Sequence, residues 1–208
     1  MATSSKEIIL KKIRQALTNQ APLPFPGSEG NSAVVTPVTN DLSILFAEEF
    51  VRLLGKFAFC SDEKDLKIQL QQLIAAKKWT KIFCIENQLN KILENPEPDF
   101  DLKDSDASIT SCEYLIARTG SIVLSSAQES GRTVSVYSPI HICIAYSDQV
   151  VFDVQDGLQL LKEKYKEHLP SLITFATGPS RTADIEKTLV VGVHGPKEVY
   201  LFLVDKQG

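Results

Sequence analysis

Between residues 41 and 86 the chain alternates twice between an amphipathic helical pattern and a short apolar run without polar alternation. Asp41 is a typical N-cap for the first helical segment, and Gly55 is typical of a helix end. Short apolar runs of this kind are typical of strands that are covered on both faces, and helices between such strands favour parallel pairing. The order predicts an α/β protein with a mostly parallel sheet, in which helices cover 42–54 and 61–77 and strands cover 56–60 and 81–86.

The second half of the chain has a different rhythm. Four strand-like runs follow one another with only turn signals between them, which predicts a β-rich segment with some antiparallel pairing. A short strand, a helix over 153–169 and a buried strand near 171–176 complete this pattern. The four runs cover 112–117, 121–126, 132–137 and 140–146.

Residues 4–18 place apolar side chains at helical spacing and are followed by a segment rich in proline and glycine. We expect an amphipathic helix and a linker over 1–40, separate from an α/β domain over 41–208. The helix docks either on its own domain or on another subunit, as in a homo-oligomer. Its basic face is too short to favour a membrane surface.

Composition narrows the class of partner and cofactor. The 208 residues carry a net charge of −4, which offers no basic field for nucleic acid. The four cysteines form no Cys-x-x-Cys pair and each lies in an apolar run, so we expect buried thiols, with no metal or iron–sulfur cluster bound by this chain. The N-terminus has no signal-peptide pattern and no apolar run is long enough to span a bilayer, so we expect a cytoplasmic protein without membrane contact.

Polar residues interrupt the apolar strands at two loops in the β-rich segment. Thr119 and Gly120 follow Arg118 between two strands, where a plain hairpin turn is the alternative to a ligand contact. Arg132 is a candidate to grip a carboxylate or phosphate, although pairing with a neighbouring acid such as Glu129 is the more common arrangement. His141 lies inside an apolar run, which more often indicates a core histidine than a ligand.

A third polar loop, "TGPSRT" at 177–182, follows the predicted strand near 171–176 and precedes a segment that can begin a helix. Ligands of open α/β sheets bind beyond the carboxyl ends of strands, where a glycine lets the backbone approach and helix N–H groups face an anion. We therefore predict an anion site here. Its candidate residues are Gly178, Ser180, Arg181 and Thr182, with Asp184 and Glu186 at the helix start.

His194 lies between two glycines and precedes Pro196. Its ordinary pKa near 6.5 suits proton transfer, so it is a catalytic candidate together with Asp184 and Glu186. A hydrogen bond to a loop carbonyl is the structural alternative.

Three segments carry a resemblance to a known family. They read "ARTGSIVLSS" at 117–126, "GRTVSVYSPIHICIA" at 131–145 and, most specifically, "TGPSRTADIEKTLVVGVHGPKEVYLFLVD" at 177–205. Through them the chain resembles the lactate utilization protein C family, whose members contain a LUD domain. Many members of that family carry an acidic residue where this chain has Arg118, so no role of a carboxylate there is carried over.

The resemblance implies a three-layer α/β/α fold similar to the NagB/RpiA/CoA-transferase class. It also implies a role in oxidising L-lactate to pyruvate beside two partner proteins that carry iron–sulfur clusters.

Two hypotheses follow. The first is a non-redox subunit whose cleft binds a small anionic metabolite through Thr119, Gly120, Arg132, His141, Gly178, Ser180, Arg181, Thr182 and His194. The second is a free-standing enzyme that acts on a small carboxylate, thioester or phosphorylated metabolite. Turnover by the purified chain alone would distinguish the second from the first.

Overall fold

The structure is a computed structural model that describes residues 41–94, 97–182, 190–192 and 194–206. The helix and linker predicted over 1–40 lie outside the described residues, as do Asp184 and Glu186. In chain order, the elements are α2 (Leu42–Arg52), β1 (Lys56–Cys60), α3 (Glu63–Lys77), β2 (Ile82–Phe83), α4 (Asn87–Leu93), η1 (Leu102–Asp104), β3 (Ala107–Thr110), β4 (Tyr114–Ile116), η2 (Ala117–Thr119), β5 (Ser121–Ser125), α5 (Val134–Tyr137), β6 (Ile140–Tyr146), η3 (Ser147–Gln149), β7 (Val150–Val151), α6 (Val154–Tyr165), β8 (Ile173–Ala176), β9 (Arg181–Thr182), β10 (Val190–Val191) and β11 (Glu198–Val204).

The first sheet has the strand order β1-β11-β6-β3-β2, and every pair in it is parallel. A second sheet has the order β7-β4-β5-β8, in which β5 runs antiparallel to both of its neighbours. The parallel sheet and the antiparallel segment of the second half are therefore both confirmed.

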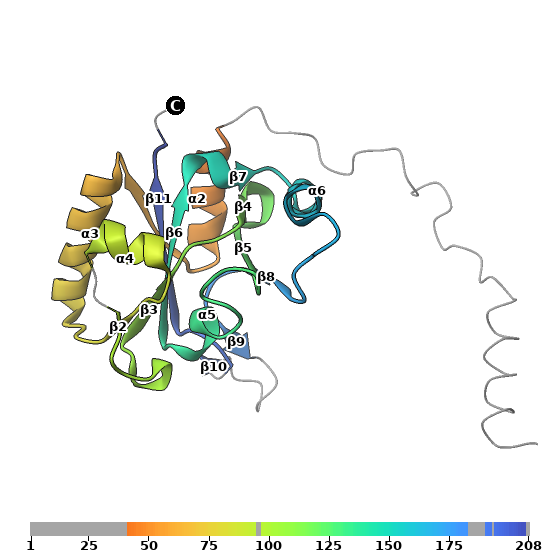
Figure 1. The fold of residues 1–208 in the computed structure, drawn as a ribbon. Coiled ribbons are helices and arrows are strands. Elements are labelled where there is room, and N and C mark those ends of the chain that lie inside the picture. The colour runs from red at the N-terminus through yellow and green to blue at the C-terminus, as the bar shows by residue number, and fades with distance from the viewer. Residues whose placement is uncertain (1–40, 95–96, 183–189, 193, 207–208) are drawn as a thin grey trace, which may run out of the picture. The chain divides into compact units, whose positions relative to one another are not determined.

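Helices and strands form layers around the parallel sheet (Figure 1). On one face, α3 and α4 pack through Leu66, Leu70 and Leu89 against apolar side chains of β3, β6 and β11. On the other face lie α2 and the second sheet, with α6 packed outside that sheet through Leu161. This arrangement agrees with the three-layer α/β fold that the family resemblance implies.

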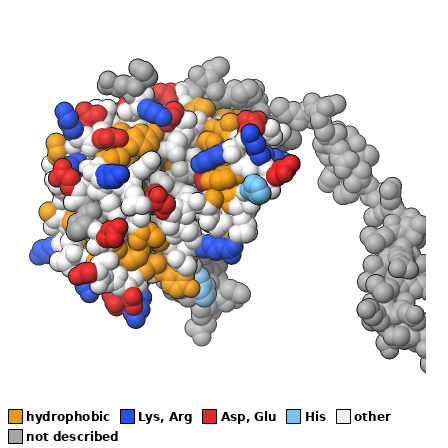
Figure 2. All heavy atoms as spheres, in the orientation of Figure 1, with side chains coloured by type: hydrophobic (Ala, Val, Ile, Leu, Met, Phe, Trp, Pro, Cys, Tyr) orange, Lys and Arg blue, Asp and Glu red, His pale blue; other side chains and the backbone are white. Residues whose placement is uncertain are grey.

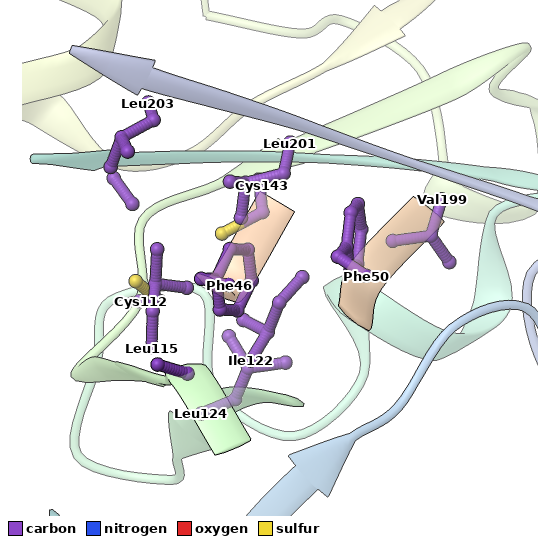
Figure 3. Packing of buried hydrophobic residues seen from close by; sticks show 12 residues of the cluster. Phe46, Phe50, Cys112, Leu115, Ile122, Leu124, Cys143, Val199, Leu201 and Leu203 are labelled. Carbon is purple, nitrogen blue, oxygen red and sulfur yellow. The ribbon is translucent and has the colours of Figure 1, made fainter. Parts of the chain in front are cut away.

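Helix α2 fills the space between the two sheets because its apolar side chains recur at helical spacing. Phe46 and Phe50 are fully buried and stack with their ring centroids 5.4 Å apart. Figure 3 shows both rings between Cys143 and Leu201 of the parallel sheet and Ile122 of the second sheet. Burying a phenylalanine side chain contributes about 1.5–3 kcal/mol, so α2 is a main support of the contact between the sheets.

All four cysteines are buried free thiols, as the sequence predicts. Burial raises the pKa of the Cys60 and Cys84 thiols to about 11 in each case, and it raises that of Cys143 as well. Such thiols are poor nucleophiles and poor metal ligands at neutral pH.

The strand predicted over 132–137 is wrong, because residues Val134–Tyr137 form the short helix α5. The alternation of β-branched residues there is a local preference, and tertiary contacts override it. Val134 is buried and its carbonyl oxygen accepts a hydrogen bond of 2.7 Å from the Ser108 hydroxyl of β3.

Charged side chains of both signs are intermixed on the face drawn in Figure 2, with apolar patches between them. This face therefore presents no basic strip of the kind that follows a nucleic-acid backbone. Within the described part of the chain, no helix is both long and apolar enough to cross a membrane.

Candidate functional site

Two Thr-Gly pairs that the sequence singles out lie side by side in the structure. Thr119-Gly120 precedes β5, Thr177-Gly178 follows β8, and these two strands are antiparallel neighbours. The hydroxyl of Ser121 lies 2.8 Å from the hydroxyl of Thr119 and 2.8 Å from that of Thr177, so it joins the two pairs. We call this arrangement the Thr-Gly clasp.

Both glycines of the clasp contact the C-terminal end of α2 with their backbones. A Cβ atom at Gly120 would lie 2.7 Å from the Phe50 nitrogen, and one at Gly178 would lie 2.5 Å from the Leu53 carbonyl oxygen. Both have positive φ, +58° and +79°, a region that side chains other than glycine rarely adopt. These positions therefore need glycine for packing as well as for backbone conformation.

Arg181 belongs to the same contact. Its Nη2 donates a hydrogen bond of 2.5 Å to the carbonyl oxygen of Leu53, the C-cap residue of α2. A cation at this position satisfies a free carbonyl and complements the negative end of the helix dipole. The guanidinium thus binds the helix end, and the structure does not bring it to the hollow described below.

Residues after Gly178 do not begin a helix directly. Arg181–Thr182 forms β9, which pairs antiparallel with β10. The segment 183–189, where the helix was predicted, lies outside the described residues. The strand before the loop, β8, also belongs to the mainly antiparallel second sheet. The rule that places ligands beyond the carboxyl ends of parallel strands therefore does not apply to this loop.

Backbone hydrogen bonds join Ser180 to the segment around His194. The Ser180 nitrogen donates to the Pro196 carbonyl oxygen at 2.9 Å, and the Gly192 nitrogen donates to the Ser180 carbonyl oxygen at 3.0 Å. The Lys197 nitrogen donates to the Pro139 carbonyl oxygen at 2.8 Å, which anchors the segment to the start of β6.

These contacts frame a hollow of about 440 Å³ at the amino ends of β6 and β11. Its lining comes from the end of α5, the residues that follow α5 and the segment between β10 and β11. Figure 1 draws α5, β9 and β10 at its lower end. Lys197 and His194 bring nitrogen groups to it and Tyr137 brings a hydroxyl, whereas Ser138 is 1% exposed and its hydroxyl accepts a hydrogen bond of 3.1 Å from Ser105 Oγ. The complete lining is Val136, Tyr137, Ser138, Pro139, Gly192, His194, Gly195 and Lys197, and we call it the amino-edge hollow.

Gly192 positions the lysine of this hollow. Its φ is +81°, and a Cβ atom there would collide with the side chain of Lys197, so the lysine stem lies directly against the glycine. Sequence reasoning missed Lys197 and Tyr137. The sequence "HGPK" at 194–197 could have indicated Lys197, because the proline fixes the backbone between the histidine and the lysine.

Two other candidates lie apart from the hollow's lining. His141 is buried in β6, and its Nε2 lies 2.8 Å from the Thr110 hydroxyl, which is the arrangement of a core histidine. Arg132 donates a hydrogen bond of 2.5 Å to the Ser171 hydroxyl, whereas Glu129 accepts one from the Asn87 nitrogen.

Arg118 forms an ion pair of 2.7 Å with Asp153, the N-cap residue of α6. This pairing holds the pKa of the Asp153 carboxyl below its usual range. The residues that the structure describes contain no group of three or more His, Cys, Asp or Glu side chains placed to hold a metal ion.

Comparison with protein families identifies the architecture. The family model of the LUD domain matches residues 99–204, which contain the clasp and the amino-edge hollow. The chain belongs to the LUD domain family. This match begins before β3 and ends with β11, so it covers the central strands of the parallel sheet and all of the second sheet.

Curated relatives of this LUD domain are named Lactate utilization protein C. The protein of Deinococcus radiodurans is 35% identical over 112 residues, covering 53% of this chain and 52% of the relative. That of Anoxybacillus flavithermus is 36% identical over 99 residues, covering 47% and 44%, and that of Geobacillus sp. (strain WCH70) is 39% identical over 107 residues, covering 50% and 44%. The chain thus spans about half the length of the curated relatives it matches.

Among solved structures, the chain is similar to a crystal structure of a DUF162 family protein from Deinococcus radiodurans. The two share 20% sequence identity with a TM-score of 0.60, and the alignment covers 81% of this chain and 99% of that one. This likeness supports the α/β fold described above for this chain.

Proposed function

We propose that this chain takes part in lactate utilization as a subunit without a redox centre, and that it binds a small carboxylate in the amino-edge hollow. The names of the curated relatives support the process. The observation that carries the binding site is the placement of Lys197 and His194 in one hollow with Tyr137. An ammonium and several neutral donors suit a carboxylate, since hydrogen bonds to ionised groups are the strong ones.

In this proposal the electrons of lactate oxidation pass to two partner proteins that carry iron–sulfur clusters. The cysteines of this chain favour that division, because the pKa values of the Cys60, Cys84 and Cys143 thiols are raised by burial and a cluster needs thiolates.

Lys197→Ala should weaken the binding of L-lactate or pyruvate by roughly 10- to 100-fold, because one charge-assisted hydrogen bond contributes about 1.5–3 kcal/mol. Calorimetric titration of each acid into the purified chain measures this. Lys64→Ala is the matched control, since Lys64 is an exposed lysine of α3 outside the hollow's lining, and it should bind as the unaltered protein does. Equal affinities in the Lys197 variant and the unaltered chain, or no saturable binding of either acid, would contradict the proposed site.

The chain purified anaerobically should carry no iron and no acid-labile sulfide, because its four cysteines are buried thiols. Metal analysis of the isolated chain is the measurement. Stoichiometric iron would contradict the division of labour, and oxidation of lactate by the isolated chain would favour a free-standing enzyme.

A further inference from the structure

A second cavity lies at the carboxyl ends of the parallel strands, whereas the amino-edge hollow lies at their amino ends. It has a volume of about 270 Å³ and opens beyond the carboxyl ends of β2 and β3. The residues that line it come from the loops after β2, β3 and β5, from the start of α4 and from the end of α6, and we call it the carboxyl-edge cavity. They are Glu86, Gln88, Ser111, Cys112, Glu113, Ala127, Gln128, Glu129, Lys164 and Tyr165.

The topology of the sheet marks this place independently of its side chains. After β2 the chain enters α4, which packs on one face of the parallel sheet through Leu89. After the neighbouring strand β3 the chain enters β4 of the second sheet, which packs on the other face. Adjacent parallel strands whose following loops diverge in this way form a topological switch point, where open α/β sheets bind their ligands.

At the floor of the cavity lies a carboxylate, that of Glu113, which forms an ion pair with Lys164 of the same chain. Glu113 is buried, and its carboxylate accepts hydrogen bonds from Ser125 Oγ at 2.6 Å, Tyr165 OH at 2.7 Å and Lys164 Nζ at 2.7 Å. Burial by itself would raise the pKa of the Glu113 carboxyl, but these hydrogen bonds outweigh it and lower that pKa below its ordinary value. Glu113 and Lys164 therefore neutralise each other.

Two further carboxyl groups line the same cavity, and neither has an ion-pair partner among the described residues. Glu86 is only 7% exposed, and both of its oxygens accept the backbone N–H of Ser111, at 3.1 and 3.2 Å. Glu129, at the rim, accepts the backbone N–H of Asn87 at 2.7 Å. Formal charges in the cavity thus sum to −2, from three carboxylates and one ammonium. A buried carboxylate without a counter-charge is costly, and a cationic ligand would remove that cost.

The remaining wall is already fixed by hydrogen bonds. The Gln128 amide accepts the Ser125 N–H at 2.8 Å through Oε1 and donates to the Ser111 hydroxyl at 3.1 Å through Nε2. The cavity is also small, since binding sites for drug-sized molecules usually measure about 300–1,000 Å³. Its size suits a ligand of a few heavy atoms.

We propose that the carboxyl-edge cavity binds a small molecule that carries a protonated amine, and that Glu86 and Glu129 accept its N–H groups while the Glu113–Lys164 pair forms the floor. The charge of the cavity separates this ligand class from the carboxylate proposed for the amino-edge hollow, because Glu86 and Glu129 would repel an anion. The two sites lie at opposite ends of the parallel strands and share no lining residue, so either proposal can be contradicted while the other stands.

Titration of the ¹⁵N-labelled full chain with ethanolamine, followed by backbone amide shifts, tests this proposal. We expect saturable shifts at Asn87, Ser111 and Ala127 and unchanged amides at Gly195 and Lys197. Glu86→Gln and Glu129→Gln should each weaken binding by about 10-fold or more, since each removes a charge-assisted acceptor. Glu63→Gln is the control, because Glu63 lines a neighbouring hollow with Gln88 and Tyr146, and it should leave the affinity unchanged.

Acetate and inorganic phosphate are the competing probes. Saturable shifts of the same amides by either anion, abolished in Lys164→Ala, would overturn the assignment in favour of an anion site. Absence of saturation with ethanolamine, or equal affinity in Glu129→Gln, would overturn it as well. If Glu86→Gln proves unstable, the exposed Glu129 still decides the outcome, because its substitution leaves the buried wall intact.

Discussion

The free energy of unfolding should fall by about 3 kcal/mol between pH 6.5 and pH 4 because of His141 alone. Burial lowers the pKa of this histidine from 6.5 to about 4 in the folded protein, whereas the unfolded chain keeps the ordinary value. Within that interval the unfolded state binds a proton that the folded state does not. Stability is therefore complete above the unfolded pKa and is lost as the pH falls toward the folded one.

Urea denaturation at a series of pH values between 6.5 and 4 measures this loss. The variant His141→Gln should be less stable at pH 7, because it disturbs the contact with Thr110, yet its stability should change less over the interval. His168→Gln removes an exposed histidine and serves as the control, which should keep the full slope. Equal slopes of stability against pH in the His141 variant and the unaltered protein would show that folding does not lower the pKa of His141.

Gly178→Ala should destabilise the protein by about 3 kcal/mol, the sum of an unfavourable backbone conformation and a steric clash. The added Cβ would lie 2.5 Å from the Leu53 carbonyl oxygen, so either α2 or the Thr-Gly clasp must move. Thermal and urea unfolding of the variant give the magnitude.

Gly131→Ala is the matched control for this prediction. Gly131 also has a positive φ, +62°, but no atom lies within 4 Å of the position its Cβ would occupy. It should cost only about 1 kcal/mol, the backbone part of the effect. Equal losses in the two variants would mean that the approach of Gly178 to α2 contributes nothing.

The elements that could be predicted from the sequence are those whose side-chain period is strong and local. Asp41 and the apolar face of α2 are an example, since the cap and the spacing lie within one segment. The stretch 132–137 shows the limit, because its β-branched residues suggest a strand while the contact of Val134 with Ser108 favours a helix. That contact joins residues 26 positions apart, so it cannot be predicted from a local sequence pattern.

The candidate site was predictable in part, for the same reason. The glycines at 120 and 178 were identified as special, but sequence spacing cannot show what a backbone without a side chain packs against. The link between Arg181 and Leu53 spans 128 positions, so the role of this arginine at a helix end depends wholly on the tertiary fold. Glu86, Glu113 and Lys164 were missed because they lie in two separate loops and a distant helix, and form no motif in the chain.

The strand order has a consequence for synthesis of the protein. β11 is the last of the described strands in chain order, so it is synthesised after the others, yet it lies between β1, the first strand described, and β6. Until residues 198–204 have been made, β1 lacks its neighbour and β6 exposes an unpaired edge, the kind of edge that promotes aggregation. The described parallel sheet therefore cannot close strand by strand in the order of synthesis, and the nascent chain must keep the edges of β1 and β6 apart from other chains until β11 inserts between them.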